Sequence, residues 1–85
     1  MPMTVVMTSG AAKEFERLPT TIKARALELF VRLQAWPDVS GAKPLRHDLA
    51  GHYRIRTGDW RVMFRVVAPN VIVVSIEHRS RVYED

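Results

Sequence analysis

Residues 52–65 alternate between polar and apolar side chains on both sides of the dipeptide Gly58-Asp59. Alternation with a period of two is typical of a half-buried β-strand, and Gly-Asp between two such runs is typical of a two-residue hairpin turn. The pattern therefore predicts an antiparallel hairpin whose register is set by the turn. Its expected cross-strand pairs are Thr57 with Trp60, Arg56 with Arg61, and Arg54 with Met63.

The two faces of this hairpin differ in character, because successive side chains of a strand point to opposite sides of the sheet. One face is apolar and is expected to pack on the core: Tyr53, Ile55, Trp60, Val62 and Phe64. The other face is mostly basic: His52, Arg54, Arg56, Arg61, Met63 and Arg65.

On the basic face, Arg56 is expected directly across from Arg61, with no acidic side chain beside them. Like charges in this position destabilise a strand pair by roughly a few tenths of a kcal/mol or more. A bound polyanion would offset this repulsion, whereas the alternative interpretation is a solvated, Arg-rich surface without a ligand. Four Arg on one face of a single hairpin favour the anion, so the pattern predicts phosphate binding on an open sheet.

Hydrophobic periodicity also predicts the elements that flank the hairpin. Apolar residues recur at helical spacing from Ile22 to Trp36, and the β-branched run at 71–76 is typical of an interior strand. The expected elements are a strand at 4–7, a helix at about 10–18 capped by Ser9, a break at Pro19, a helix from a Thr20 or Thr21 cap to about Trp36, a loop at 37–44, the hairpin, and the strand at 71–76. The fold class is α+β in the order β-α-α-β-β-β, a mostly antiparallel sheet with a helical hairpin packed on one face. The helices are expected to serve as scaffold only, with Trp36 plugging the core.

Length and composition restrict the class of protein. A chain of 85 residues is expected to form one domain, spanning 1–85, with a single modest core. The absence of cysteine excludes disulfides, zinc–thiolate sites and thiol catalysis. No apolar stretch approaches the length of a membrane span, so we expect no membrane partner, and a cytoplasmic location fits.

The charge is basic and comes mainly from arginine. The formal net charge is +4 and the pI is about 10.1, with ten Arg and three Lys against nine acidic residues. The planar guanidinium suits bidentate contacts with phosphate and stacking on bases, so the composition favours a nucleic-acid partner. Candidate contacts outside the centre of the hairpin, which could equally be solubilising charges, are Lys43, Arg46, Arg65 and Arg81.

Several segments together carry a resemblance to a known family. They are Leu18-Pro19, Lys43-Pro44-Leu45-Arg46, Leu49-Ala50-Gly51, the hairpin from Tyr53 to Val62, and His78-Arg79-Ser80-Arg81-Val82-Tyr83. Over essentially the whole chain, they resemble the RelE branch of the RelE/ParE toxin superfamily of bacterial and archaeal toxin–antitoxin systems. The resemblance implies a small, metal-free ribonuclease that enters the ribosomal A site and cuts messenger RNA. It also implies an acidic, RelB-like antitoxin as partner, in a heterodimer or heterotetramer.

The resemblance also implies roles for individual residues. Arg54 and Arg56 match the basic pair on the first strand, and Arg61 matches the phosphate clamp on the second. Arg79 follows the last strand, and Tyr83 is the terminal aromatic residue. The best-known members carry lysines at the first pair. An arginine cannot lose its proton near neutral pH, so Arg54 and Arg56 are expected to stabilise charge and not to act as bases.

The proton-transfer candidates are then His78, His52 and Tyr83. Histidine is the side chain that ordinarily titrates nearest to neutral pH, and His78 ends the last strand beside Arg79. The alternative for His78 is a hydrogen-bonded structural residue, while His47 and His52 are more typical of a surface or rim. Tyr83 could position the 2′-hydroxyl, stack on a base or act as base. Three scattered histidines give little support to a metal site, and no cofactor is expected.

Two other functions remain open at this point. One is a ParE-like inhibitor of DNA gyrase, against which the terminal Arg79 and Tyr83 argue. The other is a catalytically degenerate module that only binds RNA or its antitoxin.

Overall fold

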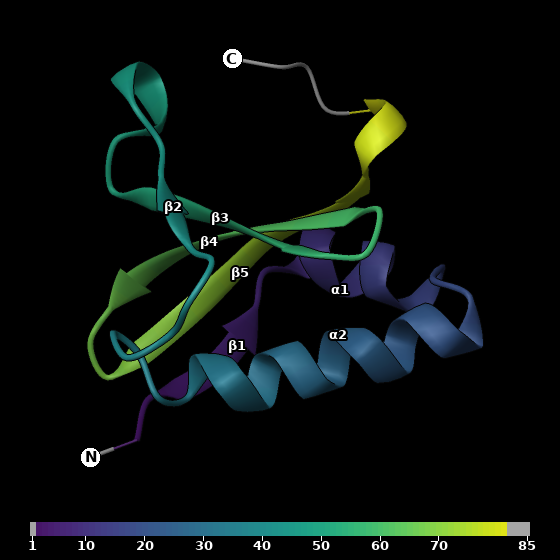
Figure 1. Cartoon of the computed structure of the whole chain (residues 1–85), viewed down its shortest axis with the longest axis horizontal. Helices are drawn as coiled ribbons and strands as arrows, with labels where there is room; N and C mark the ends of the chain where they lie inside the picture. Colours follow the sequence, from purple (N-terminus) through teal and green to yellow (C-terminus); the bar gives the residue numbers. More distant parts are fainter. Residues whose placement is uncertain (1, 82–85) are drawn as a thin grey trace.

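The computed structural model describes residues 2–81, and at Arg81 the backbone alone. A five-stranded sheet has the strand order β1-β5-β4-β3-β2, and two helices pack on one of its faces (Figure 1). The elements are β1 (Thr4–Met7), α1 (Ser9–Glu16), α2 (Thr20–Leu33), β2 (Lys43–Pro44), β3 (His52–Thr57), β4 (Trp60–Val67) and β5 (Asn70–His78), with 3₁₀ turns η1 (His47–Leu49) and η2 (Arg79–Arg81). The α+β class and the mostly antiparallel sheet are confirmed, with β2 as an additional short strand inside the predicted loop.

The register of the central hairpin is the predicted one. Thr57 lies opposite Trp60, and Arg56 lies opposite Arg61, on either side of the Gly58-Asp59 turn. Gly58 has φ +60°, a left-handed conformation that glycine adopts without the steric cost of a side chain. The turn chemistry and the alternation therefore act together to fix which residues face each other.

Strand β5 is interior, as predicted, because it pairs antiparallel with β4 and parallel with β1. Its pairing with β4 shifts by one residue, since Met63 lies opposite Ser75 and Phe64 lies opposite Val73. The extra residue, Val74, forms a β-bulge, which reverses the alternation of faces beyond it. Val73 and Ile76 are consequently both buried in the core although their spacing is odd.

The helix boundaries differ from the predicted ones. Thr8, not Ser9, caps α1, because the Thr8 Oγ1 accepts a hydrogen bond from the Ala11 amide at 3.1 Å. Helix α2 follows Pro19 without a side-chain cap and ends at Leu33, three residues earlier than expected. A residue that precedes proline is disfavoured in the helical conformation, and Trp36 precedes Pro37. Neither helix of the described chain is long and apolar enough to cross a membrane.

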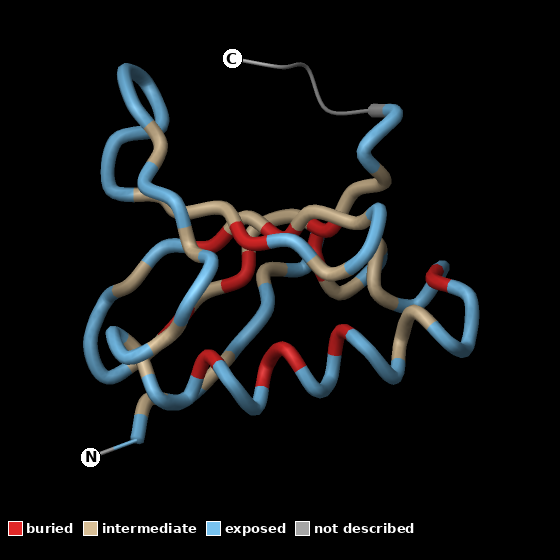
Figure 2. The backbone as a smooth tube through the Cα atoms, in the orientation of Figure 1, coloured by how far each residue is buried: buried red, intermediate tan, exposed pale blue. Residues whose placement is uncertain are grey.

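The core lies between the helices and the sheet. Figure 2 shows the buried positions of α2 turned toward buried positions of the strands. Trp36 packs at the margin of this core, with its ring edge-on to Tyr53 at 4.6 Å and to Phe64 at 5.3 Å between centroids, as a core plug would. The buried apolar residues are Ala11, Leu18, Ala26, Leu29, Phe30, Leu33, Ile55, Val62, Phe64, Val71, Val73 and Ile76. Because both helices lie on this side, they leave the other face of the hairpin uncovered.

Truncation of Phe64 tests this core. Phe64 is fully buried and contacts the rings of Trp36 and Tyr53, so Phe64→Ala should lower the free energy of unfolding by about 3–5 kcal/mol in a urea titration. Val31→Ala is the control, because this side chain of α2 is 64% exposed and its loss should change stability by less than about 0.5 kcal/mol. Equal effects of the two substitutions would contradict the packing described.

Candidate functional site

The hairpin carries three arginines on the face that the helices leave uncovered. Arg54 and Arg56 lie on β3 and Arg61 on β4, while Ile55 and Val62, between and beside them, are buried in the core. Burial of these apolar neighbours fixes the direction of the alternation and thereby turns the arginines outward. The predicted opposition of Arg56 and Arg61 is confirmed.

A second like-charge pair lies at the edge of the sheet. Lys43 of β2 lies directly opposite Arg54 of β3. The open face therefore holds two cross-strand pairs of cations, Lys43 with Arg54 and Arg56 with Arg61. Each such pair opposes folding by a few tenths of a kcal/mol or so, which makes an anionic ligand favourable here.

These side chains border a groove of about 720 Å³. Five of the lining residues are basic and none is acidic, so their fields add up within the groove and favour an anion. The lining residues are Arg32, Ser40, Gly41, Lys43, Arg54, Ile55, Arg56, Gly58 and Arg61.

Sequence reasoning missed the part of this groove that comes from the helical layer. Arg32 of α2 lines the groove and donates from Nη2 to the backbone oxygen of Ser40, at 3.0 Å. Arg25 lies two helical turns earlier, and its Nη1 lies 3.2 Å from the point that a Cβ at Gly58 would occupy. The available signal was the seven-residue spacing of these two arginines, which places both on one side of the helix, at the flank of its apolar stripe.

One acidic residue shares the basic face. Arg61 has Arg56 as its neighbour on β3 and Glu77 as its neighbour on β5. The expectation of cations without an acidic neighbour therefore does not hold at Arg61, and Glu77 offsets part of the repulsion there. Among the residues that the structure describes, Arg54 and Arg56 form no ion pair with a carboxylate.

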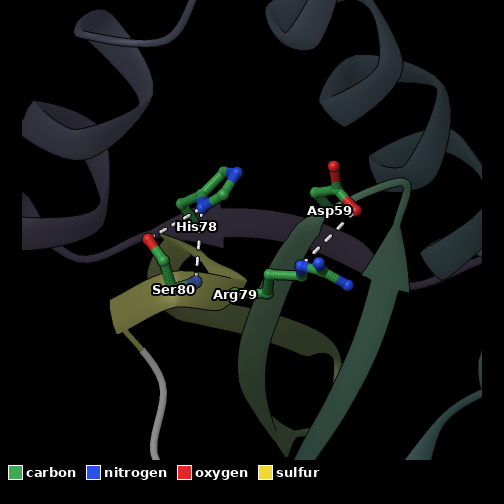
Figure 3. A network of polar contacts seen from close by, with 4 residues as sticks. All are labelled: Asp59, His78, Arg79 and Ser80. Atoms are coloured by element: carbon green, nitrogen blue, oxygen red, sulfur yellow. Dashed lines mark hydrogen bonds and ion pairs between the residues drawn. The ribbon is translucent and has the colours of Figure 1, made fainter.

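Arg79 is tied to the turn of the hairpin (Figure 3). Its amide donates to the backbone oxygen of Asp59 at 2.8 Å, and its Nε lies 3.9 Å from Asp59 Oδ1. Both side chains are about two-thirds exposed, so the ion pair is weak and the backbone bond is the firmer link. The structure thus brings Arg79 to the end of the hairpin that carries Arg56 and Arg61.

His78 lies on the other face of the sheet. It is opposite Trp60, a residue of the core face, and the two rings meet edge-on at 5.2 Å between centroids. The Ser80 amide donates to His78 Nδ1 at 3.2 Å, and the Ser80 Oγ lies 2.9 Å from the same atom (Figure 3). An amide can only donate, so Nδ1 is the acceptor and the neutral ring carries its proton on Nε2. The structure does not bring His78 together with the arginines.

The remaining predicted residues differ in their positions. Lys43 lines the groove, whereas Arg46 and Arg65 are exposed and do not line it. His52 lies opposite Arg65 and has a buried Nδ1 without a hydrogen-bond partner in the described part of the chain. Tyr83 and the side chain of Arg81 lie outside the described residues.

A comparison with known families agrees with the fold. A family model described as "ParE toxin of type II toxin-antitoxin system, parDE" matches residues 5–83, nearly the whole chain. The chain belongs to the RelE/ParE family of type II toxins. The resemblance found in the hairpin and the C-terminal motif is thereby confirmed at the level of the family.

Named relatives of this toxin come from Mycobacterium tuberculosis. Toxin RelG is 31% identical over 85 residues, which cover 98% of each chain, and Toxin RelE is 38% identical, over 96% of this chain and 87% of that protein. The solved RelBE2 toxin–antitoxin complex of the same organism contains a chain that is 32% identical, with a TM-score of 0.83 and 94% of each chain covered. The toxin therefore has the fold of a RelE-type chain that was crystallised with its antitoxin.

Removal of one cation from the Arg56–Arg61 pair should stabilise the free toxin. Arg56→Thr deletes the like-charge neighbour of Arg61 and introduces a residue suited to strands, so the free energy of unfolding should rise by about 0.2–1 kcal/mol at low salt. Arg65→Thr is the matched control, because Arg65 lies opposite His52 and Ile72. The difference between the two variants should shrink as salt is added, and a difference that does not depend on salt would contradict the electrostatic cause.

The His78 contacts predict that the imidazole anchors η2. His78→Ala removes the acceptor of the Ser80 amide, so the hydrogen-exchange protection of this amide should fall. In the variant His78→Asn, the Oδ1 atom can still accept and should keep most of the protection. Equal protection in His78→Ala and in the wild type would contradict this anchor.

Proposed function

We propose that this toxin is a ribosome-dependent endoribonuclease that cleaves messenger RNA in the A site. The observation that carries the proposal is the groove with five basic and no acidic lining residues on an open sheet. The relatives named RelE and RelG, at 38% and 31% identity, support the RelE branch of the family.

The proposed reaction needs no group beyond the RNA and the side chains. The 2′-oxygen forms a bond to the adjacent phosphorus, the bond from phosphorus to the 5′-oxygen breaks, and a cyclic 2′,3′-phosphate and a 5′-hydroxyl result. One proton leaves the 2′-hydroxyl and one is delivered to the 5′-oxygen. The phosphorane between these states carries more negative charge than the substrate, so preorganised cations lower the barrier.

Arg54, Arg56 and Arg61 are the proposed stabilisers of this charge. Their guanidinium groups stay protonated at neutral pH, so they cannot accept the proton of the 2′-hydroxyl. A bound anion lowers the repulsion between Arg56 and Arg61, and the effect is greatest when the phosphate gains charge. Arg79, tied to the turn beside them, is proposed as a further cation. Because Arg54 and Arg56 stand where the best-known members of the family carry lysines, we expect a slower enzyme than those members.

The proton-transfer residues are proposed from the C-terminal segment. Tyr83, in the position of the terminal aromatic residue, is proposed to orient the 2′-hydroxyl or to accept its proton. His78 was predicted as a second candidate, but its position behind the sheet and its hydrogen bonds with Ser80 favour a role in holding η2. Lys43 lines the groove and is proposed, with Arg46, Arg65 and Arg81, to contact messenger or ribosomal RNA.

The proposed protein partner is an acidic, RelB-like antitoxin that covers the basic groove in a heterodimer or heterotetramer. The solved RelBE2 complex from Mycobacterium tuberculosis, which contains a relative of this toxin, supports such an assembly. A toxin that acts on translating ribosomes would work in the cytoplasm.

A second candidate function follows from the description of the matching family model. That description names the ParE toxin of parDE systems, so inhibition of DNA gyrase is the alternative. A supercoiling assay separates the two functions: inhibition of gyrase without cleavage of messenger RNA would establish the alternative. A degenerate module would bind RNA in a salt-dependent manner and show no turnover on ribosomes.

Substitution of Arg61 or Tyr83 tests the proposed nuclease. Arg61→Ala removes a preorganised cation and should lower the rate of messenger RNA cleavage in a translating extract by about 10²–10³-fold. Tyr83→Ala should also abolish detectable cutting. Circular dichroism should show an unchanged fold in both variants.

Lys13→Ala is the control for these variants, because Lys13 is an exposed residue of α1 and does not line the basic groove. It should leave cleavage at the level of the wild type. Wild-type cutting by both the Arg61 and the Tyr83 variants would refute the site.

A further inference from the structure

The basic groove has one wall that belongs to the helical layer. Arg32 of α2 lines it together with Arg54 and Arg56 of β3, although the helix otherwise packs on the opposite face of the sheet. These three cations can meet only at the edge of the sheet, where the two layers come side by side. The groove therefore wraps around this edge instead of ending on the open face.

The edge is accessible because β2 is short. It pairs with only two residues of β3, Tyr53 and Arg54. Beyond Arg54, the described chain places no strand outside β3, and the groove borders the stretch from Ile55 to Gly58. An extended chain that leaves the open face can cross the edge at this place and reach α2.

Arg32 is held in place for such a contact. Its Nη2 donates to the backbone oxygen of Ser40, which fixes the long side chain between the helix and the loop that follows it. A tethered guanidinium loses less conformational freedom when it binds an anion, and its other N–H groups can still donate. Arg25, on the same flank of α2 and close to Gly58, extends the positive charge along the helix.

We propose that Arg32 binds a backbone phosphate of the RNA next to the one that is cleaved, so that the strand runs from the open sheet face across the edge of β3 to α2. This inference rests on the proposed nuclease function. RNA suits the site because its charges recur at every nucleotide, and a row of cations can then meet successive phosphates. The role of Arg32 is to bind and align the strand, while the reacting phosphate lies at Arg54, Arg56 and Arg61.

The test measures binding without cleavage. A short single-stranded 2′-O-methyl RNA lacks the attacking hydroxyl, and its Kd for the free toxin is measured at several salt concentrations. Arg32→Gln should raise the Kd by about tenfold, as expected for the loss of one charge-assisted contact. A plot of the logarithm of the association constant against the logarithm of the salt concentration has a negative slope. Its magnitude should decrease by about 0.7, the value for one phosphate on a single strand.

Three further variants define the comparison. Arg32→Lys keeps the charge and should keep the salt slope even if affinity falls. Arg17→Gln makes the same chemical change at the C-cap of α1, outside the groove, and should change neither quantity. Arg61→Gln should weaken binding and lower the slope in the manner of Arg32→Gln. In the cleavage assay, Arg32→Gln should raise KM and leave kcat nearly unchanged, whereas Arg61→Gln should lower kcat.

The outcomes separate this inference from the function on which it rests. If Arg61→Gln weakens binding and Arg32→Gln behaves as Arg17→Gln does, the RNA does not reach α2, and this inference alone is overturned. If Arg61→Gln and Arg32→Gln both leave the Kd unchanged, the groove does not bind RNA, and the proposed site also fails. If Arg32→Gln weakens binding of an acidic peptide but not of the RNA, Arg32 belongs to an antitoxin surface and the inference is overturned.

Discussion

Burial of one face of the β3–β4 hairpin is the constraint on which the rest of the molecule depends. Ile55, Val62 and Phe64 are fixed in the core beneath the helices, and a strand cannot turn one side chain inward without turning its neighbours outward. A slip of one residue would bury arginines and expose the core, so the hydrophobic effect holds the register firmly. The basic face is therefore positioned by residues that do not belong to it.

The basic face holds like charges close together at the expense of stability. Cations lie opposite cations in two cross-strand pairs, an arrangement that weakens the sheet in the absence of a ligand. Glu77 lowers the like-charge repulsion at Arg61, and the Asp59 carboxylate lies near Arg79. Among the described residues, Lys43, Arg54 and Arg56 form no ion pair with a carboxylate. The cations without an acidic neighbour thus lie toward the sheet edge, where the groove passes from the strands to α2.

The sequence allowed good prediction of features that follow from local periodicity. The hairpin register and the face that carries Arg54, Arg56 and Arg61 follow from alternation and a two-residue turn, and the family follows from motifs in the same region. The contribution of Arg32 could not be predicted in this way, because it depends on how the helical layer meets the sheet edge. The position of His78 also depends on a feature without a clear local signal, the extra residue in β5. The boundaries of the helices were predicted less well. A single hydrogen bond makes Thr8 the cap of α1, and Pro37 lies shortly after the end of α2.

The bulge at Val74 decides which chemistry each side of the sheet receives from the end of β5. Counted outward from buried Val71 and Val73 with unbroken alternation, Glu77 would point toward the helices and His78 toward the arginines. The inserted residue exchanges them, so a carboxylate faces Arg61 and an imidazole meets Trp60. If the same residues of β5 paired with β4 without a bulge, the imidazole would lie on the basic face and the carboxylate on the face toward the helices. Deletion of Val74 would remove the bulge and keep Glu77 opposite Arg61, because the pairing on either side of the extra residue is already regular.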